Sequence, residues 1–414
     1  MPIQVQCKCG KRLLAKDQSA GKRAKCPQCG DILQIPIPAG VVVAPTVAVP
    51  MARPSSRPAP SLPLQPDAHQ PEWSRFFYLI LALALIPLIF SMLGKGAGDP
   101  DEIKSRIQAT LHDNPDIARV VQAREDDMTM QEFLSMLPGH KLEGAFLPSD
   151  SWAHWVFALV AGGAFYGLVF LIFPGSIDEP MKLAGVGLFT ATIGVLLLLG
   201  FQHVAEWTGG IWRIGFGPIT FIFYIIKFIG ASYTAAEDPT TNLFVSGFGF
   251  TLGVGLCEEM CKALPVLYHF NTSNEPMSWR SACLWGLCSG FGFGLSEAVM
   301  YSSDHYNGVT GGGIYWVRFL SCVVLHGMWT GGAAIVIFRR QALLESSQGW
   351  DWLLNMILMV LEPMILHGMY DTLLKKHYDS LALVVALMTV GWFSLQIEWA
   401  RGKFDGRRVA MARA

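Results

Sequence analysis

Two adjacent glutamates and a lysine interrupt an otherwise apolar stretch of this chain. Glu258, Glu259 and Lys262 lie in the sequence GLCEEMCKALP, with apolar sequence on both sides. An ionisable side chain inside a bilayer costs roughly 2.5 kcal/mol or more on insertion scales. On a helix, Lys262 follows Glu258 by four residues and Glu259 by three, so its ammonium can reach either carboxylate. The motif therefore indicates either a buried structural ion pair or a site for proton chemistry.

Three later apolar segments each carry polar groups at a spacing of one helical turn. The pairs are Phe293 and Glu297, His326 and Thr330, and His367 and Asp371. Taken singly, a histidine in an apolar helix is usually a hydrogen-bonded packing residue. Hydrolysis inside a membrane, however, needs a base for water, a second group that aims the water and donors for the oxyanion. We therefore expect these side chains to meet in one polar pocket.

The composition indicates a membrane protein of all-α class. The 414 residues are 52% hydrophobic and only 15% charged, whereas soluble domains carry about a quarter charged residues. Mean hydropathy is +0.37. A net charge of −1 gives no reason to expect a nucleic-acid partner, so the expected partners are the lipid bilayer and a membrane substrate.

Nine apolar stretches are candidates for membrane helices. They lie near residues 73–95, 152–173, 183–201, 214–234, 242–268, 279–301, 314–338, 351–374 and 380–399. The N-terminus carries no apolar signal sequence, and the basic tail 401–414 belongs on the cytoplasmic side. Two cytoplasmic ends require an even number of crossings. We therefore favour eight transmembrane helices, with nine as the alternative count and one candidate re-entrant or tilted. We expect the protein to be integral to the cell (inner) membrane, with both termini cytoplasmic.

Glycines recur every four residues before Glu297. Gly286, Gly290 and Gly294 give that helix a smooth face on which a neighbouring helix can approach closely.

Four cysteines near the N-terminus have the spacing of a metal site: Cys7, Cys9, Cys26 and Cys29. In a reducing compartment such cysteines bind zinc as thiolates more readily than they form disulfides. Short alternating stretches beside them predict strands. We expect residues 1–38 to form a small β zinc ribbon with a structural zinc and, in the cytoplasm, a partner protein.

The rest of the chain divides by composition. The expected parts are a proline-rich disordered linker (39–72), a first transmembrane helix (73–95), a polar helical loop (96–150), an apolar core (151–400) and a basic tail (401–414).

The four motifs together resemble those of a known family. Glu-Glu-x-x-Lys, Phe-x-x-x-Glu, His-x-x-x-Thr and His-x-x-x-Asp, in this order on successive helices, are similar to the motifs of PrsW-type intramembrane proteases. They look more distantly like the CAAX prenyl protease group, whose motifs are Glu-Glu-x-x-x-Arg, Phe-x-x-x-His and His-x-x-x-Asn. The resemblance covers about residues 151–400 and leaves out the ribbon, the linker and the polar loop.

The resemblance implies roles for the acidic residues. Glu258 and Glu259 would be catalytic, one activating water and the other held by Lys262. Glu297 stands where the prenyl-protease relatives have a histidine, so it would orient the water or bind a metal.

The resemblance also implies that His326 and His367 supply metal ligands or oxyanion donors. Asp371 would sit behind His367, away from the cavity, and fix the tautomer of that ring. His326, His367 and Glu297 make a possible zinc-binding set. The sequence has no His-Glu-x-x-His motif and the relatives are described as glutamate-based, so metal-free glutamate chemistry is favoured over a metallopeptidase.

The sequence thus predicts an intramembrane endopeptidase that cleaves a membrane-associated protein or peptide in regulated proteolysis. An ion-coupled transporter is the alternative, because buried ionisable groups also mark proton relays, although no internal repeat supports it. An inactive protease-like scaffold for the ribbon is the other alternative.

Overall fold

The structure is a computed structural model of the whole chain. It describes residues 3–6, 9, 11–15, 23–26, 32–36, 77–93, 100–124, 128–172, 180–209, 211, 215, 217–272 and 277–405. The chain divides into two compact units, Met1–Ser61 and Leu62–Ala414. The linker expected at 39–72 lies outside the described residues.

The N-terminal unit contains two short β-hairpins. Strand β1 (Ile3–Gln6) pairs with β2 (Arg12–Ala15), and β3 (Arg23–Lys25) pairs with β4 (Ile32–Gln34), both antiparallel. The turns between the paired strands are where the sequence places its two cysteine pairs. Cys9 and Cys26 are described, with their sulfur atoms 3.8 Å apart, whereas Cys7 and Cys29 lie outside the described residues.

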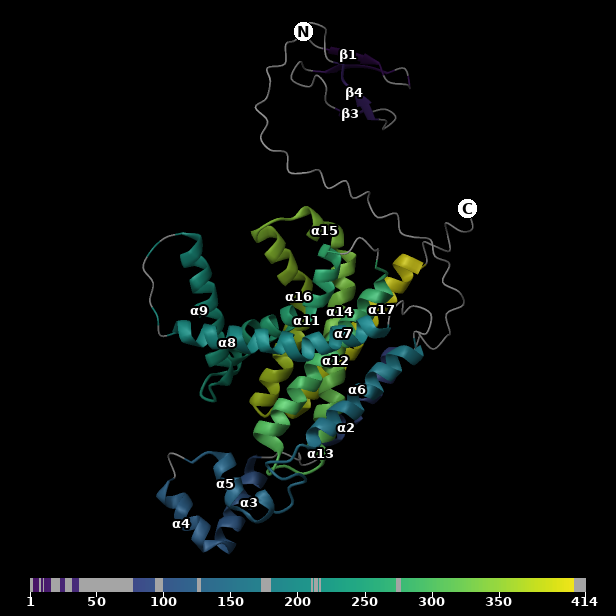
Figure 1. The fold of residues 1–414 in the computed structure, drawn as a ribbon. Helices are drawn as coiled ribbons and strands as arrows, with labels where there is room; N and C mark the ends of the chain where they lie inside the picture. The colour runs from purple at the N-terminus through teal and green to yellow at the C-terminus, as the bar shows by residue number, and fades with distance from the viewer. Residues whose placement is uncertain are drawn as a thin grey trace. The chain divides into compact units, whose positions relative to one another are not determined.

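The second unit is an all-α membrane protein, as the sequence predicts (Figure 1). Eight helical stretches are long and apolar enough to cross a membrane: Ala153–Leu171, Met181–Gly209, Pro218–Glu237, Leu243–Thr272, Trp279–Tyr306, Gly313–Arg339, Trp350–Lys375 and Asp379–Phe404. The ninth candidate is shorter. It is two helices, α1 (Phe77–Leu83) and α2 (Ile86–Leu93), separated by a turn and packed beside the span Asp379–Phe404 and the start of the span Gly313–Arg339.

The spans are built from eleven α-helices and several π-helical segments. The α-helices are α6 (Ala153–Ile172), α7 (Pro180–Phe189), α8 (Val195–Gly209), α9 (Pro218–Glu237), α10 (Leu243–Gly249), α11 (Leu256–Thr272), α12 (Trp279–Tyr301), α13 (Gly313–Trp316), α14 (Val323–Arg339), α16 (Trp350–Lys375) and α17 (Asp379–Ala400). A short α15 (Gln341–Ser346) links α14 to α16. The π-helical segments are η4 (Thr190–Gly194), η5 (Phe250–Gly255), η6 (Ser302–Tyr306), η7 (Val317–Cys322) and η8 (Arg401–Asp405).

Three π-helical segments adjoin the helices that carry the motifs. The segment η5 precedes α11, η6 follows α12, and η7 precedes α14. A π-helical turn changes the direction in which the side chains after it point, relative to those before it. Such turns are frequent at functional sites. They therefore let long apolar spans aim their few polar side chains inward.

Helix α14 is the central helix, since 94% of its apolar stretch is buried inside the protein. It packs on α12 through the glycines that the sequence singled out. A Cβ atom on Gly290 would lie only 2.8 Å from Cα of Gly327, and one on Gly294 would lie 2.9 Å from Cα of Val323. The predicted smooth face is confirmed, and it brings the glutamate of α12 next to the histidine of α14.

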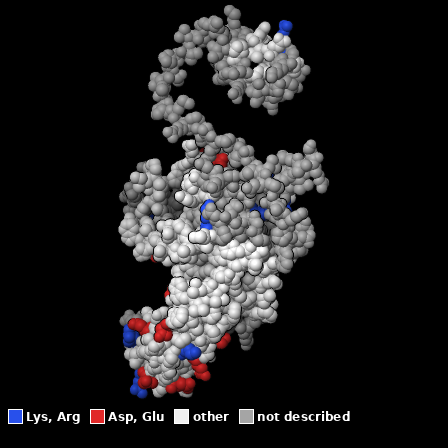
Figure 2. All heavy atoms as spheres, turned by 45° about the vertical axis from the view of Figure 1, so that its right-hand side comes forward, with Lys and Arg blue, Asp and Glu red and all other residues white. Residues whose placement is uncertain are grey.

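The polar segment before the core folds as α3 (Pro100–Asp113), α4 (Pro115–Ala123), α5 (Met130–Met136) and a 3-10 turn, η3 (Pro138–His140). It holds the loop that comes after η6, because the backbone N–H groups of Leu142 and Phe146 donate to the carbonyls of Gly308 and Thr310 at 2.8 and 2.9 Å. In Figure 2, charged side chains gather on this end, whereas the described face above it is almost free of charge.

Candidate active site

The two glutamates of α11 have different surroundings. Glu259 is fully buried, and its Oε1 lies 2.6 Å from Nζ of Lys262 and 3.0 Å from Nδ1 of His367. The side chain of Glu258 is 11% exposed, and its Oε2 lies 3.5 Å from the same Nζ and 3.7 Å from Nε2 of His367. Lys262 is therefore paired first with Glu259, and Glu258 is the freer carboxylate.

His326, on α14, lies between groups from two other helices. Its Nδ1 is 2.9 Å from Nζ of Lys262, and its Nε2 is 2.6 Å from Oε2 of Glu297. An ammonium group can only donate hydrogen bonds, so Nδ1 accepts and the ring proton lies on Nε2, which lies in close contact with the carboxylate of Glu297. Thr330 uses its hydroxyl within the helix, since it donates to the carbonyl of His326 at 3.0 Å.

His367, on α16, is held at both nitrogens. Glu259 faces Nδ1, whereas Oδ2 of Asp371 lies 3.2 Å from Nε2. The position of Asp371 differs from the expected one, because it shares the Nε2 side of the ring with Glu258 and does not lie behind it. A residue four positions further along a helix projects from the same face, whereas Nδ1 is reached from α11. Each ring nitrogen of His367 therefore faces a carboxylate, Glu259 at Nδ1 and Asp371 at Nε2.

Two residues of the site were missed by the sequence reasoning. Trp329 stacks on the ring of His367, with centroids 4.3 Å apart, and nothing in its sequence position indicates this contact. Arg318 lies in an apolar span eight residues before His326, and its Nη1 is 3.6 Å from Oε1 of Glu297. The criterion that selected Glu258, a charge in an apolar span, would also have found Arg318.

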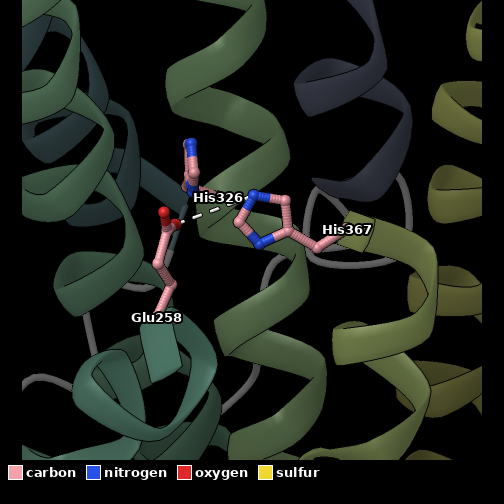
Figure 3. Close-up of side chains that lie close together, drawn as sticks. All are labelled: Glu258, His326 and His367. Carbon is pink, nitrogen blue, oxygen red and sulfur yellow. Dashed lines mark ion pairs between the residues drawn. The ribbon is translucent and has the colours of Figure 1, made fainter. Parts of the chain in front are cut away.

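Three of the predicted side chains form a set that could hold a metal ion. Ligand atoms of Glu258, His326 and His367 all lie within 4.8 Å of one another, and the three side chains come from α11, α14 and α16 (Figure 3). The carboxylate of this set differs from the expected one, Glu297. That residue lies beside the set, because its Oε2 is 2.6 Å from the Nε2 atom of His326.

The cluster has a closed side and an open side. Lys262 and Glu259 are fully buried, whereas the side chains of Glu297 and Asp371 are 22% and 24% exposed. The partly exposed edge of the cluster is therefore formed by these two carboxylates and Glu258. The arrangement can take a proton from water at Glu258 while the buried ion pair holds the opposite side rigid.

The comparisons with known proteins agree with this geometry. A model of the PrsW family of intramembrane metalloproteases matches residues 188–395, which contain all four motifs. Neither a curated protein nor a solved structure matches the chain.

Proposed function

The chain belongs to the PrsW family of intramembrane proteases, and from this premise we propose that it is an endopeptidase that cleaves a membrane-associated protein or peptide with water activated by Glu258. It is an integral membrane protein and an intramembrane peptidase. We propose regulated proteolysis as its role. A transporter or an inactive scaffold has no specific observation in its favour.

One observation carries this proposal. Three carboxylates, a lysine and two histidines converge from four apolar helices: Glu258, Glu259, Glu297, Lys262, His326 and His367. Such a cluster is costly in a membrane unless it functions. Its asymmetry, with one fully buried glutamate and one whose side chain is slightly exposed, suits a base supported by a fixed partner.

Glu258 is the proposed general base. Its carboxylate accepts a proton from water, the water oxygen bonds to the scissile carbonyl carbon, and the resulting carboxylic acid returns the proton to the leaving amine. The Nε2 atom of His367, 3.7 Å from Glu258, lies where it can orient the water. Glu259 keeps Nδ1 of that ring protonated and holds Lys262 in place.

The donors present also fit a divalent metal ion. In a tetrahedral zinc site with bonds of about 2.0–2.2 Å, ligand atoms are roughly 3.5 Å apart, so small side-chain shifts from the observed separations suffice. If the carboxylates are ionised and the imidazoles neutral, the four carboxylates of the site outnumber its two cations, Lys262 and Arg318, by two. The fourth carboxylate of this count is Asp371.

Glu258, His326 and His367 would hold the ion. Glu258 would then be a ligand and not the base, and His326 would give up its contact with either Lys262 or Glu297. Such an ion polarises the scissile carbonyl and makes bound water more acidic.

We propose a second, structural zinc in the N-terminal unit, bound by Cys7, Cys9, Cys26 and Cys29. The 3.8 Å between the sulfur atoms of Cys9 and Cys26 supports this, since two thiolates at about 2.3 Å from a tetrahedral zinc are separated by about that distance. The ribbon would bind a cytoplasmic partner. Both chain ends would then lie on the cytoplasmic side of the cell membrane, with Arg339 and Arg340.

Co-expression tests the proposed function. The wild type and Glu258→Gln are expressed with a library of tagged membrane proteins, and shortened products are identified. Products that require the wild-type residue are expected. If every product also forms with Glu258→Gln, the proposed base is wrong.

A further inference from the structure

We propose that Arg318 is a positioning residue that holds Glu297 against His326, an inference that rests on the function proposed above. Arg318 lies on η7, in the span that continues into α14. A cation at such a place needs a reason, because most of this span is buried among apolar side chains.

The guanidinium group of Arg318 is held from two sides. Its Nε and Nη2 atoms donate to the hydroxyl of Tyr306 at 3.0 and 2.7 Å. Its Cζ atom lies 4.0 Å from the ring centroid of Tyr301, within the range of a cation–π contact. The group therefore has a fixed orientation, with Nη1 directed at Glu297.

Glu297 is placed between two partners. Its Oε2 lies 2.6 Å from Nε2 of His326, and its Oε1 lies 3.6 Å from Nη1 of Arg318. The second distance is an ion pair and too long for a hydrogen bond, so Arg318 acts on Glu297 by its charge. Among the described residues, Arg318 is the one arginine or lysine side chain in an ion pair with Glu297. It steers the carboxylate without competing for the oxygen that His326 uses.

Tyr306, which accepts the hydrogen bonds of Arg318, is itself held by contacts with residues outside the membrane core. Tyr306 ends η6, and its carbonyl accepts hydrogen bonds from the N–H groups of Val309 and Thr310. The carbonyls of these two residues accept in turn from Arg106, at 3.0 Å, and from the N–H of Phe146, at 2.9 Å. A series of contacts thus links the polar segment α3–α5 and the turn after it to the site. The contacts lead from the loop after η6 to Tyr306, then to Arg318 and then to Glu297.

The first test is a double-mutant cycle in the reconstituted full chain, with a transmembrane peptide as substrate. Arg318→Gln is expected to lower kcat on the order of a hundredfold, as for a misplaced catalytic group, and to leave KM within about twofold. In the Glu297→Gln background the same change is expected to cost little more, because the two residues act as one unit. Arg318→Lys should recover part of the activity, because it keeps the charge that acts on Glu297.

Arg339→Gln is the matched control. Arg339 ends α14, packs on Trp399 with its Cζ 3.5 Å from the ring centroid, and donates to Gln396, far along the helix from His326. It is expected to leave kcat and KM unchanged. Losses from Arg318→Gln that are equal in both backgrounds, or that fall on KM alone, would overturn the positioning role.

The second test does not depend on activity. Nitrogen chemical shifts of His326 in the 15N-histidine-labelled protein, assigned with His326→Gln, report the surroundings of its Nε2 atom, including the carboxylate of Glu297 that lies 2.6 Å away. Arg318→Gln and Tyr306→Phe should both move this signal, and Arg339→Gln should not. An unmoved signal refutes the inference, whereas a moved signal in a chain that cleaves nothing keeps the positioning role and refutes the proposed protease.

Discussion

Two ion pairs of this molecule each join a basic side chain to a glutamate, but in opposite surroundings. Lys262 and Glu259, in the membrane core, are 2.6 Å apart and both fully buried. Arg124 and Glu132, in the polar segment, are 3.5 Å apart with about half of each side chain exposed. A solvated pair adds little to stability and is easily replaced. A buried pair is expensive to form and more expensive to break, so the core pair points to a function and the surface pair does not.

The largest expected difference between the two regions is in turnover. Glu258→Gln and Glu259→Gln should each lower turnover by about 10²–10⁴-fold, since they remove the base or the group that orients its partner. Glu132→Gln, the matched change in the polar segment, should leave turnover unchanged. Cleavage of a fluorogenic transmembrane peptide in proteoliposomes measures all three. Full activity of both core variants would remove the basis for assigning these residues to catalysis.

The second difference is in stability. Lys262→Met leaves Glu259 buried without its cation and should lower the free energy of unfolding by about 3–5 kcal/mol. Arg124→Met leaves a carboxylate in water and should change it by less than the error of the measurement. Titration of both variants from mild detergent into SDS, followed by tryptophan fluorescence, gives the comparison. Equal effects would mean that the core pair is as well solvated as the surface pair.

A smaller effect is expected from metal removal. The excess of negative charge around Glu258, His326 and His367 predicts that dialysis against a chelator lowers turnover by about tenfold or more and that zinc restores it. Elemental analysis before and after dialysis must confirm that the metal of the core has left. Unchanged turnover in the depleted protein would support the metal-free glutamate chemistry that the sequence favoured.

The smallest expected effect concerns the cap of α5. The hydroxyl of Thr129 accepts from the N–H of Glu132, and the carboxylate of Glu132 accepts from the N–H of Thr129. Thr129→Ala should cost about 1 kcal/mol of local stability, measured by amide exchange in α5. The backbone bond to Thr129, with a smaller effect of Arg124, lowers the pKa of Glu132 below its ordinary value.

The sign of the pH dependence is set by this lowered pKa. The stabilisation by Glu132 is present at neutral pH and is lost as the pH falls from the ordinary glutamate pKa through the folded-state value. Acidification should therefore speed exchange in α5 of the wild type more than in Glu132→Gln. The same acid response in both proteins would contradict the cap.

The sequence predicted the helical spans and the side chains that meet at the site, because charge in an apolar span is a strong signal. Hydropathy located the eight long helices, and the one-turn spacing of the motifs selected Glu258, His326 and His367. It could not decide which carboxylate joins the two histidines, since that depends on how α11 and α12 are rotated. The π-helical turns that set these rotations leave no clear pattern in the sequence.

The contacts of Asp371 and Trp329 could not be predicted from the sequence for a related reason. Spacing along α16 places Asp371 on the same face as His367, but it does not say which ring nitrogen it meets. That choice depends on Glu259, which reaches the other nitrogen from α11. Trp329 on α14 stacks on His367 on α16, and a single sequence gives no information about a contact between two helices.

The most direct test of the central claim is hydrolysis in isotopically labelled water. Purified wild type and Glu258→Gln, in proteoliposomes made in H₂¹⁸O, are given a membrane-spanning substrate peptide, and the fragments are analysed by mass spectrometry. The account predicts one new C-terminus inside the apolar segment of the substrate, carrying one ¹⁸O, with the wild type alone. A new C-terminus without ¹⁸O, cleavage only outside the apolar segment, or equal cleavage by Glu258→Gln would contradict it.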